Sequence, residues 1–214
     1  MRTPLRGSRA AGLLVALVLG RSAAADLPNV QDPKVQYDYG MSQLLGRDGA
    51  QDAAEGVVWL RKAAAQGYAD AQVQLGVCYQ QGLGVAKDLP QALAWFRRAA
   101  DQGNRRGQLH LGIAYERGEG VAPDLKQAIA YFERAAEQSH PKAQFKLGIA
   151  YRDGLGVAAD LEQAAFWLGL AAGQGSMAAQ ATFPYVEGQL APEPRARVDA
   201  RRKAWLAKHP APSP

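Results

Sequence analysis

The stretch AQVQLGVCYQQGLGVAKDLPQALAWFRRAADQG, residues 71–103, decides the fold because its pattern recurs at a fixed interval along the chain. Gly76 has counterparts at Gly40, Gly112 and Gly148, each 36 residues from the next with no insertion. Other sets of equivalent residues keep this interval: Tyr79, Tyr115 and Tyr151; Asp52, Asp88, Asp124 and Asp160; Trp59, Trp95, Tyr131 and Trp167; Ala63, Ala99, Ala135 and Ala171. A period between about 20 and 50 residues indicates stacked structural repeats.

Each repeat carries the signals for two helices. In residues 71–81 the apolar side chains share one helical face, and Gly82 favours a stop. After the loop LGVAK, Asp88 is suited to cap a second helix, Pro90 is tolerated in its first turn, and Gly103 closes it. Neither helix alone can bury its apolar face, so neighbouring repeats must stack into one core. We therefore predict an all-α fold, a right-handed α-α superhelix (solenoid) of about four helix-turn-helix repeats with a C-terminal capping helix.

The predicted repeats cover residues 35–176, as units at 35–68, 69–104, 105–140 and 141–176. Residues 177–209 begin a fifth unit in which Pro184 replaces the repeated glycine. Because the end of a solenoid must cover its core, we expect this segment to form a C-terminal cap, with Trp205 over the last apolar face. The segments 26–34 and 210–214 are expected to be disordered.

The first 25 residues match a secretory signal peptide. Arg2, Arg6 and Arg9 form a basic start, AAGLLVALVLG is the apolar stretch, and Ala23-Ala24-Ala25 is a small-residue cleavage site. The apolar stretch has roughly half of the ~20 residues that a membrane-spanning helix requires. We expect cleavage near Asp26 and a periplasmic or secreted protein that does not span the membrane afterwards. A basic leader on a cytosolic protein is the alternative.

The balance of charge argues against nucleic acid as a partner. Four of the 25 Lys and Arg residues lie in the predicted signal peptide, which contains none of the 20 Asp and Glu residues. The rest of the chain therefore holds 21 basic residues against 20 acidic ones, without the basic excess of a nucleic-acid-binding protein. Six basic residues after position 189 indicate either a solvated helix face or a contact for an anionic surface.

Three motifs occur in the same order within the repeats: A-x-A-x-x-x-L-G-x-x-Y, G-x-G-V and D-x-x-x-A-x-x-W/Y-F-x-x-A-A. This pattern resembles the Sel-one-like repeat family, the longer-period relatives of tetratricopeptide repeats. The resemblance covers residues 35–176. It implies an adaptor or scaffold that binds a partner protein, and it does not identify the partner.

The candidate binding residues lie on the face of each first helix that is opposite the core. At 100° per residue, Val73 and Val77 fall on this face, which lines the concave surface in tetratricopeptide-like solenoids. The repeat extends it into three rows: Tyr37, Val73, Leu109 and Phe145; Val77, Ile113 and Ile149; and the polar Gln74, His110 and Lys146. We predict that these ten residues line a groove for a peptide or protein segment.

The apolar rows of this face have two interpretations. Val77, Ile113 and Ile149 either line the groove or pack adjacent first helices together. The other apolar row changes in size from repeat to repeat, which favours a shaped groove. On that interpretation, Phe145→Ala and Leu109→Ala weaken partner capture and leave the helices intact.

The sequence does not predict catalysis or a cofactor. Ser139 and Lys142 match the S-x-x-K pattern of penicillin-binding enzymes, but the serine falls in a turn and the accompanying motifs are absent. Cys78 shares its position with Ala114 and Ala150, which predicts a buried, inert thiol. The three histidines lack metal-site spacing. We expect no enzyme, metal or cofactor. Regulation of a membrane sensor, or binding of peptidoglycan or a lactam, are the alternatives to a protein-binding adaptor.

Overall fold

The computed structural model describes residues 31–47 and 49–209, which fold into ten α-helices without a β-strand. The helices are α1 (Pro33–Leu45), α2 (Ala53–Ala65), α3 (Ala69–Gln81), α4 (Leu89–Asp101), α5 (Arg105–Arg117), α6 (Leu125–Glu137), α7 (Pro141–Asp153), α8 (Leu161–Gly173), α9 (Met177–Gly188) and α10 (Pro192–Lys208). We call α1, α3, α5 and α7 the A helices, and α2, α4, α6 and α8 the B helices.

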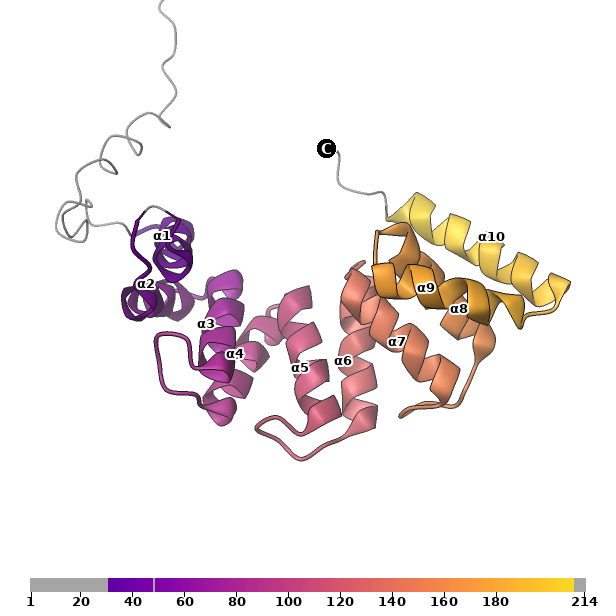
Figure 1. Ribbon diagram of the computed structural model, residues 1–214, viewed down its shortest axis with the longest axis horizontal. Coiled ribbons are helices and arrows are strands. Elements are labelled where there is room, and N and C mark those ends of the chain that lie inside the picture. Colours follow the sequence, from indigo (N-terminus) through magenta and orange to yellow (C-terminus); the bar gives the residue numbers. More distant parts are fainter. Residues whose placement is uncertain (1–30, 48, 210–214) are drawn as a thin grey trace, which may run out of the picture.

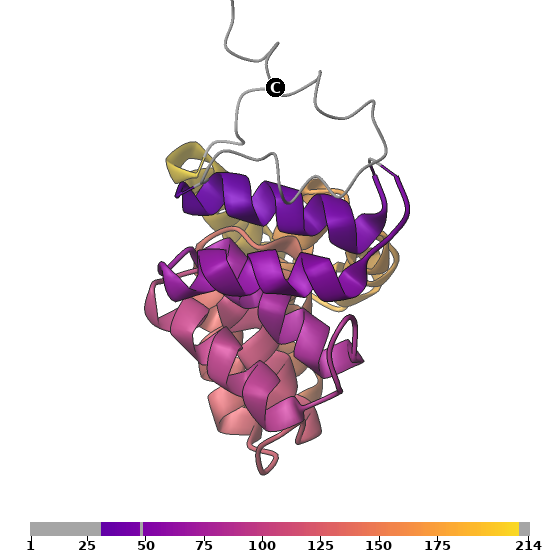
Figure 2. The same cartoon turned by 90° about the vertical axis from the view of Figure 1, so that its left-hand side faces the viewer.

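The helices are arranged as an open arc that runs from α1 to α10 (Figure 1). From α1 to α9, each helix packs on the next one along the chain. Seen from the α1 end, α1 and α2 lie side by side in front of the later pairs (Figure 2). This arrangement confirms the predicted all-α solenoid.

The first helix begins earlier than the sequence suggested. The Asp32 carboxylate accepts hydrogen bonds from the backbone N–H groups of Lys34 (2.7 Å) and Val35 (3.4 Å), and Pro33 occupies the first turn. The prediction of disorder is therefore wrong for residues 33 and 34, because this cap satisfies N–H groups that a helix start leaves free. The predicted signal peptide and the segments 26–30 and 210–214 lie outside the described residues.

Each A helix approaches its own B helix closely at the repeated glycine. A Cβ atom added to Gly76 would lie 2.5 Å from the ring of Phe96, and one added to Gly112 would lie 2.5 Å from the ring of Phe132. Both rings are only 2% exposed, so they have little room to move away. The glycine therefore sets the distance between the two helices of a repeat.

The loops after α3, α5 and α7 each begin at a glycine that ends the helix, and each loop touches the preceding repeat. Gly118 ends α5 in the left-handed conformation (φ 72°). Gly120 follows against the start of α4, where an added Cβ would lie 2.7 Å from the carbonyl oxygen of Leu89. The next B helix is capped by Asp124, which accepts a hydrogen bond from a first-turn N–H group at 3.0 Å. Asp52, Asp88 and Asp160 cap the other B helices in the same way.

Buried glutamines link the repeats in a relay that the sequence analysis missed. The side-chain oxygen of Gln72 accepts a hydrogen bond from Gln102, at the end of the B helix in its own repeat (2.7 Å). Its side-chain nitrogen donates to the Ala64 carbonyl of the preceding repeat (3.2 Å). Gln144 makes the equivalent pair of bonds to Gln174 and Ala136. Because buried polar groups are costly unless they are paired, this relay favours one stacking geometry.

The last B helix is buried on more sides than the earlier ones. All residues of α8 from Ala164 to Ala171 are buried, because α10 packs across α8 in addition to α7 and α9. Trp205 of α10 packs on Phe166 (ring centroids 5.8 Å apart) and Trp167 (5.5 Å). The position of Phe166 is occupied in earlier repeats by the smaller Val58, Ala94 and Ala130. The aromatic side chains of α8 and α10 thus close the end of the core.

Several arginines of the basic C-terminal segment also hold α10 on α8. Arg197 forms an ion pair with Glu162 at 2.6 Å, and Arg202 donates to the Gly169 carbonyl oxygen at 3.2 Å. The Arg201 guanidinium lies 3.9 Å from the centroid of the Phe166 ring. Within residues 31–47 and 49–209, none of the helices is both long and apolar enough to cross a membrane.

Two histidines lie at the junctions of the middle repeats. The ring of His110 in α5 stacks on Phe96 in α4, with centroids 4.4 Å apart and an angle of 9° between the planes. Burial, with smaller contributions from the cations of Arg106 and Lys142, lowers the pKa of His110 to about 4. Burial, with a smaller contribution from the Arg105 cation, also lowers the pKa of His140 to about 4. Its Nδ1 atom is buried without a hydrogen-bond partner among the described residues. Both junctions therefore hold neutral imidazoles.

We expect Gly112→Ala to destabilise the protein by about 1–3 kcal/mol, because the added methyl group overpacks the contact with Phe132. Gly173→Ala is the matched control, since nothing lies within 4 Å of its added Cβ. Its helix propensity should leave stability unchanged or raise it by up to about 1 kcal/mol. Urea unfolding followed by circular dichroism measures both changes. Equal stability of the two variants would contradict the close helix contact.

We also expect the protein to lose stability as the pH falls from about 6.5 towards about 4, because the unfolded chain takes up protons that the buried histidines do not bind. The free energy of unfolding should fall by up to about 1.4 kcal/mol per pH unit for each histidine. Thermal unfolding of wild type and the His110→Asn/His140→Asn variant at about pH 7.5 and about pH 5 checks this. The double variant should lose less stability than wild type on acidification. An equal loss of stability in the two proteins would refute the expectation.

Candidate partner-binding groove

The A helices lie on the inner side of the arc. The A helix α3 contacts α5 directly, and α7 contacts α9, whereas B helices of successive repeats do not approach one another to the same extent. An ion pair between Lys146 of α7 and Glu116 of α5 also joins two A helices, with N–O distances of 2.7 and 3.0 Å. The inner surface of the arc is therefore built from the A-helix faces that the sequence analysis selected.

The predicted apolar rows are buried in the middle of the arc and open towards its ends. Val73 is 0% exposed, Leu109 5% and Ile113 7%, so these side chains belong to the core. Leu109 and Ile113 share a core cluster with residues of α6, α7 and α8, and the three side chains cannot touch a partner in this conformation. Leu109→Ala is accordingly expected to lower stability by creating a cavity. Tyr37, Val77, Phe145 and Ile149 are half-buried and keep accessible surface. The groove prediction is thereby reduced to these residues and the polar row.

The polar row has three different environments. Gln74 is half-buried on α3, and His110 is held in the stack with Phe96. Lys146 is paired with Glu116 and lines a cavity. Of the polar residues predicted for the groove, the structure therefore brings only Lys146 together with the accessible apolar residues Phe145 and Ile149.

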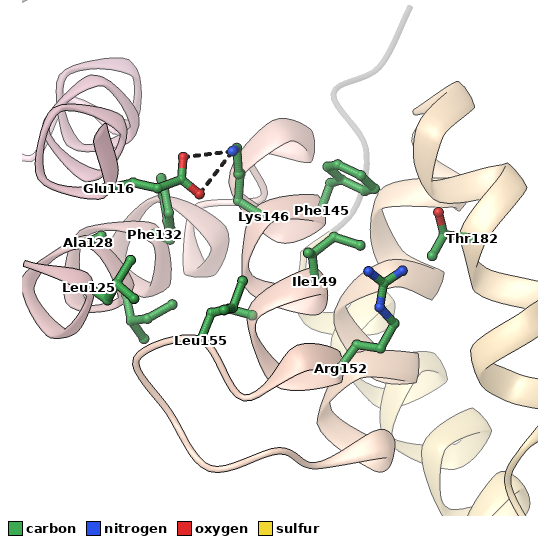
Figure 3. Close-up of a pocket in the computed structure, with 12 residues that line it drawn as sticks. Glu116, Leu125, Ala128, Phe132, Phe145, Lys146, Ile149, Arg152, Leu155 and Thr182 are labelled. Carbon is green, nitrogen blue, oxygen red and sulfur yellow. Dashed lines mark hydrogen bonds and ion pairs between the residues drawn. The ribbon is translucent and has the colours of Figure 1, made fainter. Parts of the chain in front are cut away.

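This cavity, of about 390 Å³, lies at the α7 end of the inner surface (Figure 3). Its volume falls within the range of about 300–1,000 Å³ that is typical of ligand sites. The lining is mainly apolar and comes from α5, α6, α7, the loop after α7, and α9: Glu116, Leu125, Ala128, Ile129, Phe132, Phe145, Lys146, Ile149, Ala150, Arg152, Leu155 and Thr182. We call this set the terminal cavity. Leu125 and Leu155 are 42% and 43% exposed, so the cavity has an apolar rim open to solvent.

The fifth unit has a small residue at the position equivalent to Phe145. Continuing the row of Val73, Leu109 and Phe145 by 36 residues reaches Ala181 of α9, which is exposed. A small side chain there leaves Phe145 without the large neighbour that the earlier repeats supply. This substitution was visible in the sequence. The contributions of Leu125, Ile129, Phe132 and Leu155 were missed, because they come from the B helix α6 and a loop.

Arg152 places a charge on the wall of the terminal cavity. Figure 3 shows its guanidinium directed from α7 towards Thr182 and Phe145. Its Nε and one terminal nitrogen, Nη2, donate to the two carboxylate oxygens of Asp153, each at 2.7 Å. This pairing lowers the pKa of Asp153 and raises that of Arg152. The cavity therefore combines an apolar pocket with an oriented cation at its edge.

Of the residues considered for catalysis, Ser139 lies in a turn and Cys78 lies in the core. Ser139 lies in the turn before α7 with φ 58°, at the position that Gly67, Gly103 and Gly175 occupy in other repeats. Cys78 is 0% exposed, and burial raises the pKa of its thiol to about 11, which disfavours the reactive thiolate. In the described part of the chain, no three His, Cys, Asp or Glu residues come together as metal ligands do.

Two solved structures share this arrangement of helices. A Sel1 repeat protein from Oxalobacter formigenes is 28% identical with a TM-score of 0.70, over 90% of this chain and 74% of that chain. A protective antigen of uropathogenic Escherichia coli strains, which displays an SLR fold, is 27% identical with a TM-score of 0.57. That comparison covers 87% of this chain and 47% of the antigen, so the chain spans about half of the antigen's length.

The sequence model of the Sel1 repeat matches four consecutive segments, 33–68, 69–104, 105–140 and 141–176. These are the predicted repeats, with the first extended to include the start of α1. No curated protein matches the chain. The four matches together span more than half of the sequence, and the chain belongs to the Sel1 repeat family.

Proposed function

We propose that this protein is an exported, non-enzymatic adaptor that binds a segment of a partner protein at the terminal cavity. Sel1 repeat proteins are generally protein–protein interaction modules, and their fold is a non-enzymatic scaffold. The terminal cavity carries the proposal, because it combines accessible apolar surface with charged side chains on the inner side of the arc.

The terminal cavity suits an apolar anchor from a peptide segment. Phe145, Ile149 and Leu155 would contact the anchor, and burial of an aromatic or aliphatic side chain in such a pocket supplies much of the binding energy at protein interfaces. The Lys146–Glu116 ion pair at one side and Arg152 at the other limit the apolar area. The charged groups would thus select the register of the segment while the apolar contacts hold it.

Site-specific crosslinking tests this proposal. We expect p-benzoylphenylalanine at Leu155, on the cavity rim, to form an adduct with a discrete protein in envelope extract. The same group at Leu206, which is 51% exposed on α10, should not form that adduct. Phe145→Ala should weaken the adduct about fivefold or more, since an anchoring contact contributes at least about 1 kcal/mol. Adduct formation that is equal at both positions, or unaffected by Phe145→Ala in a folded protein, would count against the cavity.

The part of the proposal that concerns export is supported by the amino-terminal sequence. The basic start, apolar stretch and Ala23-Ala24-Ala25 site support removal of the first 25 residues and a periplasmic or secreted location. Amino-terminal sequencing of the protein recovered from cell fractions should find a start at or near Asp26 outside the cytosol. Recovery of the uncleaved chain in the cytosol would rule out export.

A further inference from the structure

The charged side chains on the wall of the terminal cavity differ in where their ion-pair partners lie. Glu116 and Lys146 neutralise one another across the gap between α5 and α7. The partner of Arg152 is Asp153, which is not part of the cavity lining. A segment bound in the cavity therefore meets one cation whose counter-ion lies outside the cavity.

One edge of the Arg152 guanidinium is free. Asp153 occupies the side formed by Nε and Nη2, leaving the N–H groups of Nη1 and one N–H of Nη2. Nη1 has no hydrogen bond to any residue that the structure describes. An arginine has five N–H donors in a planar fork, so it can bind two carboxylates at once, one on each edge.

The pairing with Asp153 also fixes the direction of this free edge. Arg152 is 31% exposed, and a long side chain at such a position would otherwise sample several rotamers. The two 2.7 Å bonds hold the guanidinium in the orientation seen in Figure 3, with its terminal nitrogens towards Phe145 and Thr182. An anion bound there needs little further ordering of the side chain, which favours binding.

We propose that the bound segment carries an aspartate or glutamate side chain close to its apolar anchor, and that the free edge of Arg152 binds this carboxylate. The inference rests on the proposed function, because it specifies the chemistry of the segment that the terminal cavity takes. A lysine or arginine at the same point of the segment would meet the free N–H groups of the Arg152 cation and would be disfavoured. Asp153 acts as a positioning residue for Arg152.

Selection from a library of random peptides of about twelve residues, displayed on phage and captured on the purified protein, tests the proposal. The enriched peptides should combine a large apolar residue with Asp or Glu a few positions away. Synthetic copies of one such peptide then allow affinity measurements with defined variants. A second peptide with Asn or Gln in place of the acidic residue separates the carboxylate contact from the apolar one.

Arg152→Gln should weaken binding of the acidic peptide about tenfold, since a charge-assisted contact of this kind contributes on the order of 1.4 kcal/mol. It should hardly affect the neutral peptide, and the coupling between the two substitutions isolates the contact. Arg97→Gln is the matched control, because it removes an exposed arginine of α4 outside the cavity lining. Asp153→Asn should weaken binding less than Arg152→Gln and should leave the preference for an acidic peptide in place.

The possible failures are distinguishable. Peptides that require Phe145 but lack an acidic residue, or that bind Arg152→Gln as tightly as wild type, would overturn the inference and leave the proposed function standing. If the selection yields no peptide whose binding depends on Phe145, both the inference and the proposed function are overturned. Enrichment of basic peptides would reverse the charge assignment of the site.

Discussion

The contact between a glycine backbone and a large buried side chain, made once in each repeat, is the constraint on which the rest of the structure depends. Gly76 meets Phe96, Gly112 meets Phe132, and Gly148 meets Leu168 at distances that leave no room for a methyl group. A constant spacing between A and B helices gives every repeat the same geometry. Because the repeats have the same geometry, residues 36 positions apart face the same direction, and rows of side chains can form a continuous surface.

Rigid repeats give a defined surface only if the junctions between them are also defined. The glutamine relay contributes here, because Gln72 and Gln144 each bond to their own repeat and to the preceding one. Burial makes an unpaired glutamine costly, so a shifted junction would lose hydrogen bonds on both sides. The resulting curvature brings the A helices together on the inner side. Val73 and Leu109 are buried in this arrangement, whereas Phe145 keeps accessible surface and the next residue in its row is the exposed Ala181.

The fold was predictable because its signals are local and repeated. Glycine at helix ends, aspartate at helix starts and the 36-residue interval each have a direct physical meaning, and together they agree with the ten helices. The site was predictable only in part. A helical wheel gives the direction of Val73 or Leu109 from its helix axis, and it does not give the distance to the next A helix. The orientation of Arg152 depends on its pairing with Asp153, which sequence spacing alone does not establish.

The central claim is that a partner segment binds at the terminal cavity, and methyl NMR of the protein with a bound peptide tests it most directly. On saturation with a peptide selected for binding, we expect the largest shift changes at the methyl groups of Ile129, Ile149 and Leu155, which line the cavity. The methyl groups of Val58 and Leu206, which are exposed elsewhere on the surface, should remain unchanged. Shift changes confined to α1 and α2, or to α10, with none at Ile149 would contradict binding at the terminal cavity.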